Sequence, residues 1–316
     1  MSMENNNWTE KDIPSQASKR IVITGANSGI GFLAAKVLAG KNAEVILAVR
    51  NEELGNAAAE SIRREHPQAK LSVMKLDLSS FASVRQFAEL FLQKYDHLSV
   101  LINNAGIMAI PHYKTEDGFE MQFGTNHLGH FALTGRLLIA LKNSPGARVV
   151  TTSSSYHMQG KIDFSEIEGS KGYKETKVYN SMGAYKQSKL ANLLFARELQ
   201  RRFESAGINA ISVGTHPGYV RTNLHAVGPQ LSGSRLKGVM MKLMSVLAQS
   251  PEMGVLPTLY ASTSSAIQGG EYMGPTRFFG MHGYPGPAQS SQLSLDAELA
   301  KKLWKASEEM TGVAYL

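Results

Sequence analysis

Short apolar runs, rich in valine and isoleucine, alternate along the chain with longer segments of helical periodicity. Runs that are apolar throughout are typical of strands whose two faces are both buried. Alternating strands and helices build right-handed βαβ units, so the strands should lie parallel. We therefore expect an α/β fold with one doubly wound parallel sheet flanked by helices on both faces. The expected strands are 20–24, 44–49, 71–75, 99–103, 148–152 and 209–214, and the expected helices are 29–40, 51–65, 80–95, 117–142 and 183–205.

The pattern continues without a linker, which predicts a single domain at 19–316 after a polar N-terminal extension at 1–18. A terminal helix is expected at 296–311. Residues 223–250 interrupt the rhythm, because they combine glycines with apolar side chains at helical spacing. This segment is interpreted either as a core-facing or oligomer-facing helix, or as a mobile lid over a substrate. Its apolar residues are Leu236, Val239, Met240, Leu243, Met244 and Leu247.

Composition excludes several kinds of chemistry. The absence of cysteine rules out disulfides, thiolate nucleophiles and cysteine-ligated metals, and the nine histidines show no ligand spacing, so no metal site is expected. The net charge of +7 comes from scattered lysines and arginines, which favours a solvated basic surface over a nucleic-acid footprint. The N-terminus lacks the apolar core of a signal peptide, and no run reaches the roughly 18 apolar residues of a membrane helix. We expect a soluble, cytoplasmic protein.

A glycine-rich turn joins the first expected strand to the first helix. It reads Thr24-Gly25-Ala26-Asn27-Ser28-Gly29-Ile30-Gly31. Gly25 permits a tight turn, Gly29 lets the backbone approach a pyrophosphate, and Gly31 allows close helix packing. The helix N-terminus adds free N–H groups and a positive dipole end. This context predicts a Rossmann-type dinucleotide site, with Asn27 as a further polar contact.

The end of the second strand indicates which dinucleotide is preferred. An NAD enzyme places an acidic residue there to bind the ribose 2′-hydroxyl. Here the strand ends in Val49, Arg50 and Asn51, without an acid before Glu52. Arg50 can pair with a 2′-phosphate, which predicts NADP(H) as the cofactor, although Arg50 can also be read as an ordinary surface residue.

A tyrosine and a lysine four residues apart share one face of a helix. A nearby ammonium favours the phenolate and should lower the pKa of the tyrosine, which titrates near 10 in water. The pattern occurs twice, as Tyr173 with Lys177 and as Tyr185 with Lys189. Tyr173 lies in a polar stretch without apolar periodicity, whereas Tyr185 opens a long amphipathic helix. We therefore expect Tyr185 and Lys189 to be the functional pair.

Together these motifs resemble those of the short-chain dehydrogenase/reductase family over roughly residues 18–275. The resemblance includes Asp77-Leu78, Asn103-Asn104-Ala105-Gly106, Asn126-His127-Leu128-Gly129-His130-Phe131 and His216-Pro217-Gly218. The NHLGHF and SKLAN (188–192) segments are most similar to the retinol dehydrogenase-like group. The resemblance implies cofactor contacts from Asp77, Leu78, Asn104, Ala105, Gly106, Tyr185, Lys189, Pro217, Gly218 and Thr222.

The resemblance also implies a catalytic set. Three serines, Ser153, Ser154 and Ser155, follow the fifth strand, and the family pattern selects Ser154. Asn126 is similar to the asparagine that holds a water near the lysine. The implied reaction is NADP(H)-dependent interconversion of a carbonyl and an alcohol. The substrate pocket should lie over the nicotinamide, where the connections 156–182 and 223–250 can reach it. A bulky apolar substrate and a homodimer or homotetramer are expected.

Two alternative functions remain open. A non-catalytic NADP(H) sensor or scaffold on the same fold would need the glycine turn but not the complete catalytic set. A protochlorophyllide reductase-like enzyme shares much of the pattern, but that group is associated with cysteines around its pigment, and this chain has none.

Overall fold

A computed structural model describes residues 7–165, 179–220 and 248–315. One eight-stranded sheet runs through it in the order β3-β2-β1-β4-β5-β6-β7-β8. The first seven strands are parallel, and β8 pairs antiparallel with β7. The α/β fold is therefore as expected. The strands are β1 (Arg20–Thr24), β2 (Glu44–Val49), β3 (Lys70–Lys75), β4 (Val100–Asn103), β5 (Ala147–Thr152), β6 (Ala210–Thr215), β7 (Tyr272–Arg277) and β8 (His282–Pro287).

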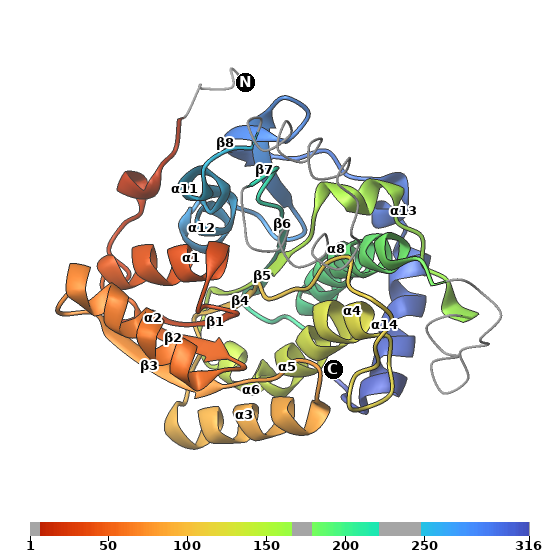
Figure 1. Ribbon diagram of the computed structural model, residues 1–316, viewed down its shortest axis with the longest axis horizontal. Helices are drawn as coiled ribbons and strands as arrows, with labels where there is room; N and C mark the ends of the chain where they lie inside the picture. The colour runs from red at the N-terminus through yellow and green to blue at the C-terminus, as the bar shows by residue number, and fades with distance from the viewer. Residues whose placement is uncertain (1–6, 166–178, 221–247, 316) are drawn as a thin grey trace.

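Helices cover both faces of the sheet (Figure 1). One face packs against α1, α2, α11 and α12, and the other against α3, α5, α6, α8 and α14, so each face has its own apolar core. The helices are η1 (Glu10–Asp12), α1 (Gly29–Gly40), α2 (Glu52–Glu65), α3 (Phe81–Lys94), α4 (Met121–Phe123), η2 (Gly124–Leu128), α5 (Gly129–Arg136), α6 (Leu138–Lys142), η3 (Ser155–Gln159), α8 (Ser181–Ser205), α11 (Pro251–Gly254), α12 (Leu256–Thr263), α13 (Gln292–Leu295) and α14 (Ala297–Thr311).

The single helix expected at 117–142 is wrong. Glu120 accepts hydrogen bonds from the backbone of Gln122 and Phe123, so the helix begins only at Met121. A π-helical turn, η2, follows at Gly124–Leu128, and Leu137 separates α5 from α6. Turns of this π type are rare and are often found at functional sites.

The N-terminal residues pack against the first core. Trp8 and Ile13 are buried there, and the Trp8 ring meets Tyr260 of α12 edge to face at 5.0 Å. Among the described residues, no helix has both the length and the hydropathy needed to span a membrane. The boundary at residue 18 stays a prediction.

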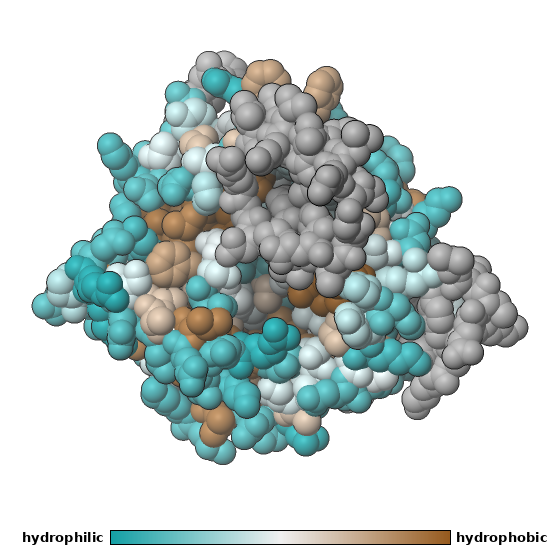
Figure 2. All heavy atoms as spheres, viewed as in Figure 1, coloured by the Kyte–Doolittle hydropathy of each residue, from teal (hydrophilic) through white to brown (hydrophobic). Residues whose placement is uncertain are grey.

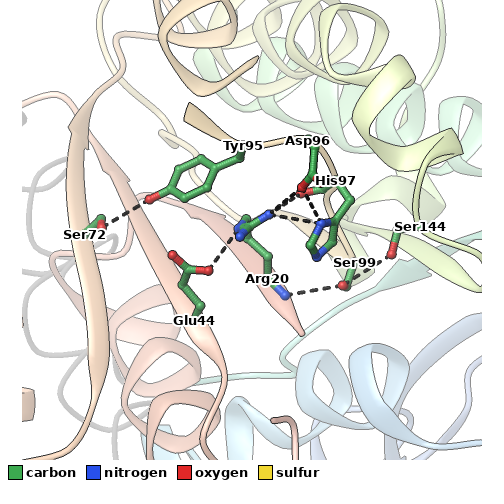
Figure 3. Close-up of polar contacts among 8 residues, drawn as sticks. All are labelled: Arg20, Glu44, Ser72, Tyr95, Asp96, His97, Ser99 and Ser144. Atoms are coloured by element: carbon green, nitrogen blue, oxygen red, sulfur yellow. Dashed lines mark hydrogen bonds and ion pairs between the residues drawn. The ribbon is translucent and has the colours of Figure 1, made fainter. Parts of the chain in front are cut away.

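A polar cluster joins the amino ends of β1, β2 and β4 (Figure 3). The Arg20 Nε atom lies 3.0 Å from Glu44 Oε2, and its guanidinium lies 4.3 Å from the centre of the Tyr95 ring. Arg20 also donates to the His97 carbonyl at 3.2 Å. These contacts hold the amino ends of the strands together, at the end of the sheet opposite to the glycine turn.

Candidate active site

The glycine turn after β1 leaves the N-terminus of α1 without a side-chain cap. Asparagine, serine or aspartate side chains cap α2, α3, α8 and α14, but Ser28 makes no such hydrogen bond. A Cβ atom on Gly31 would lie 2.5 Å from the Gly25 carbonyl oxygen, so only glycine allows α1 to approach the turn this closely. The first N–H groups of α1 are therefore available to an anion, which fits a dinucleotide pyrophosphate.

The remaining residues of the turn differ in exposure. Ser28 and Gly29 are exposed, Asn27 is half-buried and Ile30 is buried, so the exposed part of the turn is its centre. Gly25 and Gly29 have φ values of 66° and 55°, a region that glycine enters without strain.

The ends of β2 and β3 carry the residues expected near the adenosine. Arg50 is exposed and forms no ion pair with a carboxylate in the part of the chain that the structure describes. Asn51 caps α2 by accepting from the Leu54 amide at 3.0 Å. Asp77 accepts from the backbone and hydroxyl of Ser79 at 2.9 and 2.6 Å, and Leu78 is buried.

The ends of β1 and β4 are hydrogen bonded to each other. The backbone N–H groups of Asn104 and Ala105 both donate to Thr24 Oγ1 at 2.9 Å. The Asn104 side chain donates to the Thr24 carbonyl, also at 2.9 Å. These strands lie at the switch point of the sheet order, where ligands bind in open α/β sheets.

Ser154 and Tyr185 meet at the carboxyl end of β5. Tyr185 lies in the first turns of α8, which Asn180 caps, and only 5% of the tyrosine is exposed. The Ser154 side chain lies close enough to the Tyr185 hydroxyl to lower its pKa. The neighbouring Ser153 hydroxyl instead donates to the Lys189 carbonyl at 2.7 Å, so it turns away toward the backbone of α8.

Burial dominates the protonation of Tyr185 and Lys189. Lys189 is 3% exposed, its Nζ donates to the Thr152 carbonyl at 3.2 Å, and burial lowers its pKa to about 8. Burial raises the pKa of Tyr185 to about 12, although the hydrogen bond from Ser154 opposes the change. The expectation that Lys189 lowers the tyrosine pKa is therefore not met in this structure. The ammonium lies 5.7 Å from the centre of the Tyr185 ring, and desolvation of the phenolate by burial is the largest influence on the tyrosine pKa.

Asn126 lies in the π turn η2 and is completely buried. Its side chain accepts from the Ile107 amide at 2.8 Å and donates to the Ile107 carbonyl at 2.9 Å. It also donates to Ser188 Oγ at 3.0 Å, and Ser188 donates to the Tyr185 carbonyl at 2.8 Å. A Cβ atom on Gly106 would lie 3.2 Å from Asn126 Oδ1 and 3.4 Å from Lys189 Nζ, so these two polar groups flank Gly106.

Segment 216–220 follows β6 and is fastened to the β7–β8 hairpin. Gln249 donates to the Pro217 carbonyl at 2.6 Å, and the Tyr219 amide donates to the Met281 carbonyl at 3.0 Å. Gly218 packs against this hairpin. Thr222, Tyr173, Lys177 and all but the last three residues of the expected lid lie outside the described residues.

Sequence reasoning assigned no role to three polar residues of this region. His130 and Ser188 belong to the NHLGHF and SKLAN segments, so the motifs pointed to them, but the sequence did not show their hydrogen-bond partners. Gln249 belongs to no motif, and nothing in the sequence indicated it. Among the described residues, no group of three or more histidine, aspartate or glutamate side chains could hold a metal ion.

Comparisons with known proteins identify the family to which the chain belongs. A family model described as short chain dehydrogenase matches residues 19–230. Human retinol dehydrogenase 13 is 38% identical over 306 residues, which cover 95% of this chain and 87% of that protein. Human retinol dehydrogenase 11 is 40% identical over 295 residues, with coverages of 93% and 86%.

Solved structures show the same fold. An uncharacterized protein from Mycobacterium Paratuberculosis has a TM-score of 0.80 and 40% identity, over 98% of this chain and 99% of that one. A short chain dehydrogenase from Escherichia coli CFT073, complexed with NADPH, has a TM-score of 0.63 and 24% identity, over 82% and 96%, and this likeness concerns the fold alone. The chain belongs to the short-chain dehydrogenase family of oxidoreductases and, within it, is similar to the retinol dehydrogenases.

Proposed function

We propose that this protein is an NADP(H)-dependent oxidoreductase that interconverts a carbonyl compound and an alcohol. The observation that carries the proposal is the buried Tyr185 hydroxyl beside the Ser154 side chain, with Lys189 one helical turn along α8. Two hydroxyls on one small site can both donate to a substrate oxygen, and one of them can transfer its proton.

The cofactor site is proposed along the carboxyl edge of the sheet. The uncapped N-terminus of α1 would hold the pyrophosphate, and Arg50, which is exposed and has no carboxylate partner among the described residues, would bind a 2′-phosphate through a charge-assisted contact. Asp77, Leu78 and the segment Asn104 to Gly106 would line the adenosine and ribose side, and Pro217 with Gly218 the nicotinamide end. When bound, NADPH supplies the two electrons of the reduction as hydride.

The catalytic roles follow from the protonation of the two buried groups. With a pKa of about 12, Tyr185 carries its proton at physiological pH and can donate it to the substrate oxygen during reduction. The Lys189 ammonium would stabilise the phenolate that forms, because opposite charges attract strongly where water is excluded. Ser154 would hold the oxygen, and Asn126 would support the lysine side of the site.

The proposed substrates are bulky and apolar. Figure 2 shows apolar side chains gathered toward the middle of one face, whereas the surface over α2 and α3 is mostly hydrophilic. The names of the relatives indicate retinol as an alcohol that they oxidise, so all-trans-retinal is a sensible first substrate for this chain, with steroid ketones, quinones and aliphatic aldehydes beside it.

Purified protein with NADPH or NADH and this carbonyl panel tests the proposal. We expect turnover with NADPH, and we expect Arg50→Asp to lower kcat/KM for NADPH roughly tenfold to a hundredfold, the effect of one charge-assisted contact. Tyr185→Phe should abolish turnover while NADPH still binds, and Tyr173→Phe should change neither property. NADPH binding without turnover of any carbonyl would favour a sensor, and equal kcat/KM values for the two cofactors would contradict the NADP(H) assignment.

A further inference from the structure

A buried chain of hydrogen bonds passes through His130. Its Nε2 atom lies 2.9 Å from Thr24 Oγ1, and its Nδ1 atom lies 2.9 Å from the Asn126 carbonyl oxygen. Thr24, Asn126 and His130 are each at most 1% exposed. The imidazole therefore bridges the end of β1, directly before the glycine turn, and the π turn that carries Asn126.

The partners determine the direction of each hydrogen bond. A carbonyl oxygen can only accept, so Nδ1 of His130 must carry a hydrogen. Burial lowers the pKa of His130 to about 4, so the ring is neutral near pH 7 and its Nε2 can only accept. Thr24 Oγ1 already accepts from the amides of Asn104 and Ala105. Its own hydrogen has two acceptors in reach, Nε2 of His130 at 2.9 Å and the Ile102 carbonyl at 3.4 Å, and the shorter contact assigns it to Nε2.

Asn126 connects this contact to α8 through its side chain. Its Nδ2 donates to Ser188 Oγ at 3.0 Å, and Ser188 Oγ donates to the backbone carbonyl of Tyr185 at 2.8 Å. His130 is thus the link between the strand ends that shape the glycine turn and the helix that carries Tyr185 and Lys189.

We propose that His130 is a positioning residue that holds the cofactor turn and the Asn126–Tyr185 side of the site in one fixed arrangement. The inference rests on the proposed function, because it concerns how that site is aligned. It requires the neutral imidazole with hydrogen on Nδ1, since only this form donates to Asn126 while it accepts from Thr24.

His127, three residues before His130 and on the π turn η2, is a buried histidine with a structural contact only. It is also 1% exposed, but its Nε2 lies 3.0 Å from Ser307 Oγ on α14, away from the glycine turn. Removing the Ser307 hydroxyl therefore perturbs a buried histidine contact of the same turn without touching the proposed chain. Ser307→Ala is the matched control.

The test compares His130→Phe, His130→Gln and Ser307→Ala with the wild-type protein. His130→Phe keeps the ring volume but lacks both nitrogens, and we expect kcat/KM for NADPH and retinal to fall about 10- to 100-fold, as for other losses of orienting contacts. The NADPH Kd, read from the cofactor fluorescence without turnover, should also rise. His130→Gln can donate and accept, so it should recover part of both losses, whereas Ser307→Ala should lower Tm with unchanged kcat and KM.

Histidine ¹⁵N chemical shifts of the protein without cofactor provide an independent readout, and hydrogen on Nδ1 of His130 is expected. Hydrogen on Nε2, or His130→Phe with wild-type Kd and kcat and only a lower Tm, would overturn the inference. If His130→Phe does not fold, His130→Gln decides: no change in Tm, Kd or kcat refutes the role. A wild-type protein that binds NADPH but turns over no carbonyl refutes the proposed function instead. The NADPH Kd of the variants and the tautomer of the His130 ring still test the positioning role in that case.

Discussion

The stability of this protein should rise with pH because of Lys189. In the unfolded chain the ammonium keeps its proton up to a pKa of 10.5, whereas in the folded protein burial lowers that pKa to about 8. Between these values the unfolded state binds more protons than the folded state, so raising the pH favours folding. Below pH 8 both states are protonated and the cost of the buried charge is fully present. The gap between the two pKa values corresponds to about 3 kcal/mol.

The measurement is the free energy of unfolding in urea from pH 7 to pH 10, for wild type and Lys189→Met. Methionine keeps most of the side-chain volume but has no charge, so its curve contains every other titration of the protein. We expect the difference between the two curves to change by about 2–3 kcal/mol in favour of the wild type as the pH rises. Lys186→Met, on the same helix, controls for the loss of a lysine. A difference that stays constant across this range would show that Lys189 is not desolvated as the structure indicates.

Two further substitutions test the two ends of the strands. Gly31→Ala places a Cβ 2.5 Å from the Gly25 carbonyl oxygen, so α1 must move. We expect a loss of about 1–3 kcal/mol in stability and a clear rise in the NADPH Kd, and unchanged cofactor binding would refute the turn as the cofactor site. Arg20→Met removes the contacts to Glu44 and His97 at the amino ends of the strands (Figure 3). We expect urea unfolding to show a loss of about 1–3 kcal/mol with unaltered kcat and KM. Altered kinetics would contradict the view that this cluster is independent of the candidate site.

The six parallel strands expected from the sequence all exist, with bounds within one residue. They could be predicted because a strand buried on both faces must be apolar throughout, and this is a property of the sequence itself. The strands β7 and β8 were missed. Their sequences, YMGPTR and HGYPGP, contain glycine and proline, which are depleted in strands. An antiparallel pair at the sheet edge tolerates them, and only the tertiary position of the hairpin makes this clear.

The breaks in the segment 117–142 had a different cause. Apolar residues continue through it, so the periodicity favours one helix. The carboxylate of Glu120 and the π turn at Gly124–Leu128 interrupt it instead, and neither changes the apolar pattern. The residues of the candidate site could be named from their motifs, because glycine turns and Tyr-x3-Lys spacings are local. The hydrogen bonds of His130, Ser188 and Gln249 join elements far apart in the chain, so their partners follow only from the fold.

The buried Lys189 ammonium links the stability of the fold to the proposed reaction. Among the described residues, no carboxylate forms an ion pair with it, and its Nζ has the Thr152 carbonyl as a partner. A buried charge without a counter-ion destabilises the folded protein before reaction. In the proposed reaction Tyr185 would give its proton to a substrate oxygen, and the phenolate would become that counter-ion. The attraction would then exist only as the proton leaves, which would stabilise the transition state more than the ground state and so accelerate the chemical step.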